Sequence, residues 1–66
     1  MQIKVNGETL EFETPLNMLA LTEHLQINPR QVAVERNREI VPRSTYGEVT
    51  LTDGDEIEIM HFIGGG

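Results

Sequence analysis

The sequence predicts an α+β fold in which one helix packs against a single mixed β-sheet. Three observations support this class: apolar and polar residues alternate near both ends of the chain, a short helical stripe lies between them, and turn residues separate the segments. The chain has 66 residues, too few for a second hydrophobic core. We therefore expect one domain over residues 1–66.

A β-hairpin is expected over residues 1–13. Its first strand alternates apolar and polar side chains with period two, as a half-buried strand does. The dipeptide Asn6-Gly7 follows, and both residues accept the positive φ angles of a type I′ turn. In the second strand the same alternation turns Leu10 and Phe12 toward the core.

A helix is expected over residues 18–25, after a proline has ended the hairpin. Asn17 can cap its first turn by accepting a hydrogen bond from a free backbone N–H group. Met18, Leu21 and Leu25 fall on one side of the helix and form a stripe that can cover the apolar face of the hairpin.

Three further strands complete the predicted sheet. They are residues 31–35, 39–41 and 56–62, with a turn at Asn37 between the first two. Residues 48–51 are also expected to be extended. An irregular turn at 43–47 is expected to place Tyr46 at the edge of the core, and Asp53-Gly54-Asp55 is expected to form a tight structural turn. The element order β-β-α-β-β-β is that of the β-grasp, or ubiquitin-like, fold, which by itself indicates no function.

The charge of the chain excludes some classes of partner. Eleven acidic and five basic residues give a net charge of −6. Binding to nucleic acid or to an anionic membrane requires a basic surface, so we expect neither partner. An acidic surface favours solubility or a basic groove on a partner protein. The longest apolar run, residues 18–21, is too short for a membrane span, so a cytoplasmic protein is the simple expectation.

Sequence signatures of catalysis are lacking. The chain has no cysteine, no nucleophile elbow and no glycine-rich phosphate loop. His24 and His61 lie far apart without neighbouring ligands, and Asp53 and Asp55 lack the other ligands of a calcium loop. We therefore expect no metal, no bound cofactor and no enzymatic activity.

The segment that carries functional information is the C-terminal one. Ile57 and Ile59 are expected to face inward, so Met60 and Phe62 face outward and form a docking patch; the alternative is that the sheet curls and Phe62 folds back onto the core. Three glycines follow, and a glycine tail can thread a narrow channel because it has no side chains. Its terminal carboxylate becomes an acyl donor only after activation.

The sequence resembles the ThiS family of thiamine-biosynthesis sulfur carriers over essentially its whole length. The residues that carry the resemblance are Val5-Asn6-Gly7, Val32-Ala33-Val34-Glu35-Arg36-Asn37, Ile40-Val41-Pro42-Arg43-Ser44, Asp53-Gly54-Asp55-Glu56-Ile57 and Gly65-Gly66. Many relatives have alanine where this chain has Gly64, a difference expected only to loosen the tail.

The resemblance implies a carrier that works with two enzymes. An ATP-dependent, ThiF-like enzyme would adenylate the terminal carboxylate, which is then converted to a thiocarboxylate that donates sulfur to a ThiG-like thiazole synthase. Gly66 would carry the adenylate and the thiocarboxylate. The residues expected to contact the partners are Gly65, Gly64, Ile63, Phe62 and Met60. Alone, the protein is expected to be a monomer.

Other functions remain open from the sequence. The chain could carry sulfur for molybdopterin or another sulfur pathway, although those relatives tend to be longer. It could be a protein modifier that forms isopeptide bonds, as ubiquitin does. It could also be a regulatory β-grasp module that binds RNA or small molecules, but its acidity and its diglycine end argue against that role.

Overall fold

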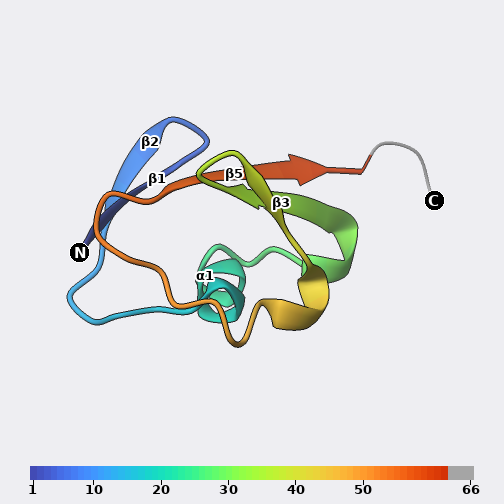
Figure 1. Ribbon diagram of the computed structural model, residues 1–66, viewed down its shortest axis with the longest axis horizontal. Coiled ribbons are helices and arrows are strands. Elements are labelled where there is room, and N and C mark those ends of the chain that lie inside the picture. Colours follow the sequence, from blue (N-terminus) through green and yellow to red (C-terminus); the bar gives the residue numbers. More distant parts are fainter. Residues whose placement is uncertain (63–66) are drawn as a thin grey trace.

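A computed structural model describes residues 1–62 and shows one helix packed on one face of a five-stranded sheet (Figure 1). The sheet order is β2-β1-β5-β3-β4. The elements are β1 (Gln2–Val5), β2 (Glu8–Glu11), α1 (Met18–His24), β3 (Val32–Arg36), β4 (Glu39–Val41) and β5 (Glu56–His61), with short 3₁₀ turns at Pro29–Gln31 and Arg43–Thr45. This is the predicted β-grasp arrangement. No helix within residues 1–62 has the length and apolar character needed to cross a membrane.

The first hairpin forms as the sequence predicts. β1 and β2 pair antiparallel with Ile3 opposite Leu10, so both side chains face the helix. Asn6 and Gly7 have φ angles of 50° and 83°, the left-handed values that a type I′ turn requires. The expected inward position of Phe12 is also confirmed, since it packs against the core just beyond the end of β2.

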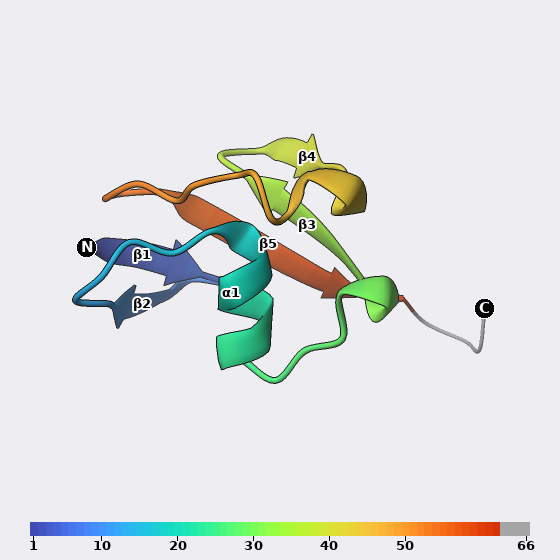
Figure 2. The ribbon, with the colours of Figure 1, turned by 90° about the horizontal axis from the view of Figure 1, so that it is seen from below.

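The helix begins where the cap was expected. The side chain of Asn17 accepts a hydrogen bond of 2.7 Å from the backbone N–H of Ala20. Met18 and Leu21 are fully buried, and Leu25 packs at the edge of the core. Seen from below in Figure 2, α1 lies across the middle of the sheet. It is the one α-helix within residues 1–62, so the described part of the chain places no α-helix on the opposite face.

β5 lies at the centre of the sheet. It pairs parallel with β1, with Val5 opposite Ile57, and antiparallel with β3, with Val34 opposite Ile59. These four side chains are all buried beneath the helix. The core is therefore assembled from residues at both ends of the chain.

One expectation for residues 43–51 needs correction. Tyr46 does not cover the edge of the core but lies within it, with only 2% of its surface exposed. Residues 48–51, which were expected to be extended, make one isolated bridge, between Thr50 and Asn17. Leu51 is buried and donates its backbone N–H to the carbonyl of Leu16.

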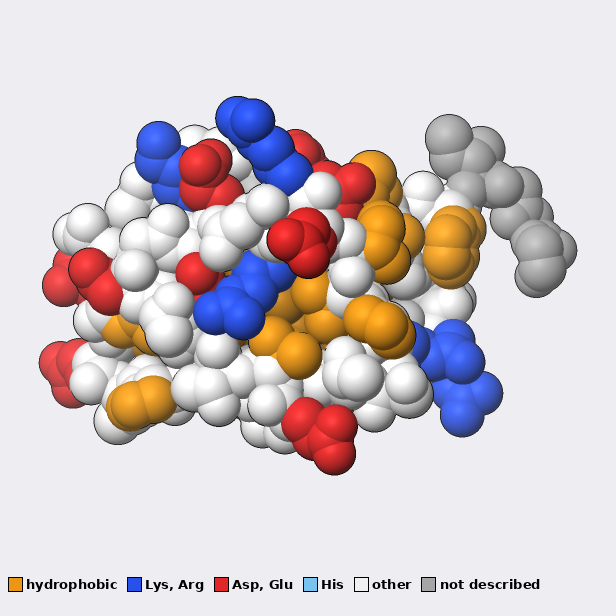
Figure 3. All heavy atoms as spheres, viewed as in Figure 1, with side chains coloured by type: hydrophobic (Ala, Val, Ile, Leu, Met, Phe, Trp, Pro, Cys, Tyr) orange, Lys and Arg blue, Asp and Glu red, His pale blue; other side chains and the backbone are white. Residues whose placement is uncertain are grey.

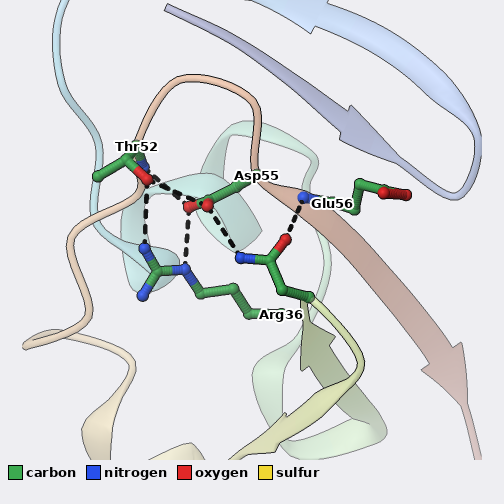
Figure 4. Close-up of polar contacts among 5 residues, drawn as sticks. Arg36, Thr52, Asp55 and Glu56 are labelled. Carbon is green, nitrogen blue, oxygen red and sulfur yellow. Dashed lines mark hydrogen bonds and ion pairs between the residues drawn. The ribbon is translucent and has the colours of Figure 1, made fainter.

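The turn at 53–55 buries a charged residue. Asp55 is 4% exposed, and its carboxylate accepts four hydrogen bonds (Figure 4). The donors are the backbone N–H of Thr52 at 2.8 Å, the Thr52 hydroxyl at 3.1 Å, Asn37 Nδ2 at 3.1 Å and Arg36 Nε at 2.9 Å. Asp55 thus ties the loop before β5 to the β3–β4 turn.

Burial and hydrogen bonding have opposite effects on the pKa of Asp55. Burial alone would raise the pKa of the carboxyl group, but the hydrogen bonds from Thr52, Asn37 and Arg36 together hold the pKa of Asp55 below its ordinary value. The ionised carboxylate therefore stabilises the fold. That stabilisation is present above the unfolded pKa, about 3.9, and is lost as the pH falls through the lowered folded pKa.

We expect Asp55→Asn to lower the free energy of unfolding at pH 7 by about 2–4 kcal/mol, because it removes the ion pair with Arg36 and places a buried NH₂ group opposite the donors of Thr52, Asn37 and Arg36. Urea denaturation measures this loss. The variant should also lose part of the acid sensitivity of the wild-type protein below about pH 4. Equal stability of the two proteins at pH 7 would contradict a structural role for Asp55.

Candidate docking surface at the end of β5

Two large apolar side chains are exposed at the end of β5, Met60 within the strand and Phe62 just after it. Met60 is 40% exposed and Phe62 is 64% exposed, whereas Ile57 and Ile59 are buried on the helix side. The expected alternation is confirmed, and the alternative in which Phe62 folds back onto the core is wrong. Figure 3 shows that the exposed apolar side chains on the viewed face gather mainly in the half of the molecule toward which β5 runs.

A side chain holds this end of β5 on the β1 side. The backbone N–H of Asn6 donates to the carbonyl of Ile57 at 2.9 Å, and the main chain then turns away from β5. The side-chain amide of Asn6 accepts from the N–H of Ile59 at 2.7 Å and donates to the carbonyl of Ile59 at 3.2 Å. A carboxamide has the same donor and acceptor as a peptide group. Asn6 thus extends the parallel ladder beyond the point where the β1 main chain ends.

On the other side, β5 pairs with β3 along nearly its whole length, and the contact continues to Phe62. Val32 lies opposite His61, and the backbone N–H of Phe62 donates to the carbonyl of Gln31 at 3.1 Å. The exposed patch of Met60 and Phe62 therefore follows a segment that is held on the β1 side as far as Ile59 and on the other side as far as Phe62. Such a site needs little ordering when a partner binds, which favours affinity.

The structure also places the remaining residues that the sequence singled out. His24 is exposed on the helix and its ring makes an edge-to-face contact with Phe12, with centroids 5.0 Å apart. His61 is exposed near the end of β5, as expected, and the two histidines do not form a common site. Ile63, Gly64, Gly65 and Gly66 lie outside the described residues, so their expected roles stay predictions.

Sequence analysis missed the two asparagine side chains that fix β5. Asn6 and Asn37 were interpreted only as turn residues. In addition to its bond with Asp55, Asn37 accepts from the N–H of Glu56 at 2.9 Å, at the start of the strand. A sequence signal existed, because the side chain of a turn asparagine can form hydrogen bonds with backbone groups. The bonded residues, however, lie too far away along the chain to be inferred from the local pattern.

Comparison with known protein families agrees with this architecture. The ThiS family model matches residues 2–66. The chain belongs to the ThiS family. It is 38% identical to the sulfur carrier protein ThiS of Bacillus subtilis over 65 residues, covering 97% of this chain and 98% of that one.

Two longer relatives of this ThiS-family chain are thiazole synthases. It is 48% identical to that of Paramagnetospirillum magneticum over all 66 residues and 47% identical to that of Magnetococcus marinus. In both cases the chain spans 20% of the length of the relative. Among solved structures, the crystal structure of the thiamine biosynthesis protein ThiS from Geobacter metallireducens superimposes with a TM-score of 0.87 at 33% identity, covering both chains completely.

We expect Asn6→Gly to loosen the end of β5 while keeping the turn, because glycine accepts the positive φ angle of this position. Amide hydrogen exchange should accelerate at Ile59, which loses its acceptor, more than at amides of β3 that bond to β4. Asn6→Asp retains the acceptor oxygen and should preserve more of the protection at Ile59. Wild-type exchange at Ile59 in Asn6→Gly would contradict the role of the side chain.

We expect Phe62→Ala to change the free energy of unfolding by no more than about 0.5 kcal/mol, since the ring is mostly exposed. If the ring is a central contact, the substitution should weaken partner binding by about 1–2 kcal/mol. Ile59→Ala, three positions earlier and facing inward, is the matched control and should cost about 2–5 kcal/mol of stability. A comparable loss in Phe62→Ala would place the ring in the core.

Proposed function

We propose that this protein is a sulfur carrier of thiamine biosynthesis whose C-terminal carboxylate, on Gly66, is adenylated and converted to a thiocarboxylate. The thiocarboxylate would then donate its sulfur to a thiazole synthase. The observation that carries this proposal is the match to the ThiS family over residues 2–66, which includes the terminal glycines. The protein named sulfur carrier in Bacillus subtilis matches over almost its full length.

The chemistry of the carboxylate explains why a second enzyme is needed. A terminal carboxyl group has a pKa of about 3.5 and is ionised and unreactive at neutral pH. Attack of this carboxylate on the α-phosphate of ATP would release pyrophosphate and form an acyl-adenylate. A hydrosulfide-equivalent sulfur could then displace AMP to leave the thiocarboxylate.

The nucleotide chemistry is assigned to a ThiF-like adenylating enzyme. The chain has no phosphate-binding loop, and its net charge of −6 would repel a triphosphate. The protein would therefore act as a co-substrate and not as an enzyme. Because activation requires ATP and a partner enzyme, we propose that it works in the cytoplasm.

The surface at the end of β5 fits the role of a carrier. Met60 and Phe62 are exposed immediately before residues 63–66, at the end of β5, and that strand is held by Asn6 and β3. A partner that binds these side chains would receive Ile63, Gly64, Gly65 and Gly66 directly. The two thiazole synthase relatives support an acceptor of that class, since each contains a region similar to this entire chain.

The experiment that tests the proposal compares the full chain with a variant that lacks Gly66. With ATP, the adenylating enzyme and a sulfide source, the full chain should gain mass equal to replacement of one oxygen by sulfur, as measured by intact mass spectrometry. The shortened chain should have unchanged stability, because residues 1–62, which form the fold, are intact. It should form no acyl-adenylate, because it lacks Gly66. Wild-type adenylation of the shortened chain would contradict the proposal.

A further inference from the structure

The first hairpin turn contains a residue pair that is chemically reactive in an unfolded chain. The side-chain carbonyl carbon of an asparagine can be attacked by the backbone nitrogen of the residue that follows, which contributes to the thermal lability of asparagine. The attack is fastest before glycine, because glycine has no side chain to shield its nitrogen. Asn6 precedes Gly7, whereas the other asparagines of the chain precede methionine, proline and arginine. The sequence therefore singles out Asn6 as the reactive asparagine.

In the folded protein the side chain of Asn6 is bound to β5 through both of its polar atoms. Its Oδ1 accepts from the N–H of Ile59 at 2.7 Å, and its Nδ2 donates to the carbonyl of Ile59 at 3.2 Å. Two bonds to one residue fix the orientation of the planar carboxamide. Because the attack by Gly7 expels Nδ2, the bond from Nδ2 to Ile59 must break for the reaction to occur. The native contact and the reaction therefore compete for the same atom.

This pair of bonds lies where the structure can open without unfolding the core. Asn6 and Gly7 are exposed, and apart from the chain neighbours nothing lies within 4 Å of the position that a Cβ of Gly7 would occupy. The bonds to Ile59 also lie beyond the backbone bond from Asn6 to Ile57, toward the end of β5. Exposed contacts of this kind open at a lower free-energy cost than buried ones. Local opening would therefore release the Asn6 side chain while the core stays folded.

We propose that Asn6 is a site of spontaneous deamidation that is protected while β5 is in place, and that the reaction permanently loosens the end of β5. The Gly7 nitrogen forms a bond to Cγ of Asn6, and Nδ2 leaves as ammonia together with the amide proton of Gly7. The product is a cyclic succinimide. Water then opens one of its two carbonyl–nitrogen bonds, which gives either aspartate or isoaspartate. No oxidant or reductant takes part.

Neither product can restore the native contact with Ile59. Aspartate keeps an acceptor for the N–H of Ile59 but has no N–H group to donate to its carbonyl. In isoaspartate the main chain runs through Cβ and Cγ, so the backbone of the turn becomes longer by one carbon atom. Isoaspartate therefore disturbs both the turn and the contact. The loss falls on the part of β5 that leads to the exposed Met60 and Phe62.

The second hairpin provides a matched comparison within the same chain. Asn37 has a φ angle of 51°, against 50° for Asn6, and its side chain also bonds to β5, at the N–H of Glu56. The residue after it is Arg38, whose side chain shields its backbone nitrogen. Asn37 should therefore react slowly even in the unfolded chain. Arg38→Gly removes this shield and should make Asn37 as reactive as Asn6 when the chain is unfolded.

The test incubates the full chain in mildly alkaline buffer and locates aspartate and isoaspartate by peptide mapping and mass spectrometry. In guanidinium chloride above the unfolding midpoint, Asn6 should react much faster than Asn37. In the folded protein Asn6 should react at least about tenfold more slowly than in the unfolded chain. Below the midpoint its rate should rise with denaturant in parallel with amide exchange at Ile59, because the same opening releases both groups.

Each part of the proposal has an outcome that would overturn it. Equal rates at Asn6 in the folded and unfolded chains would show that β5 gives no protection. A rate no higher than that of Asn37 in the unfolded chain would show that Asn6 is not a preferred site. The modified protein carries an additional carboxylate and is separated by anion exchange. Its amide exchange at Ile59 should be faster than in the unmodified protein, and an unchanged rate would contradict the loosening of β5.

Discussion

The arrangement of the whole sheet depends on β5, because within the described chain it is the strand that joins the two hairpins. β1 pairs with β2 and β5, and β3 pairs with β4 and β5. Without β5 the two hairpins share no hydrogen-bonded strand. β5 is also the last of the described strands along the sequence, so the sheet is complete only when β5 lies between β1 and β3, which come much earlier. Such long-range pairing is costly in entropy and needs specific contacts to fix its position.

Two asparagines supply those contacts, one at each end of the strand. Asn37 bonds to the backbone of Glu56 where β5 begins, and Asn6 bonds to the backbone of Ile59 near its end. Both occupy the first central position of a type I′ turn, where asparagine tolerates the positive φ angle and its side chain can reach main-chain groups. The same residue thus shapes the turn of each hairpin and connects that hairpin to β5. This double use explains how a small sheet can fix the register of its central strand.

The parts of the fold that the sequence predicted are those set by local pattern. Alternation of Ile57 and Ile59 with Glu58 and Met60 is a property of any half-buried strand, so the outward direction of Met60 could be inferred without knowing its neighbours. The helix and its cap at Asn17 follow from residues only a few positions apart.

The parts that could not be predicted depend on distant partners. Asn6 and Ile59 are 53 positions apart, and the burial of Asp55 depends on Arg36 and Asn37 from another hairpin. Residues 48–51 could be predicted to be extended, but their partners could not: Thr50 forms a bridge with Asn17, and Leu51 bonds to the carbonyl of Leu16, both far away along the chain.

The two faces of the sheet differ in how far their side chains are buried. On the helix side, buried side chains such as Ile3, Val34 and Ile59 fill the core, and the charged group beside them, Asp55, is fully hydrogen-bonded. On the face turned away from α1, Glu35 lies opposite Glu58, and Met60 of β5 is exposed. A domain of this size has little stability to spare. Its buried side chains are therefore needed for stability, and the exposed Met60 and Phe62 can be used for contact with a partner at little cost to the fold.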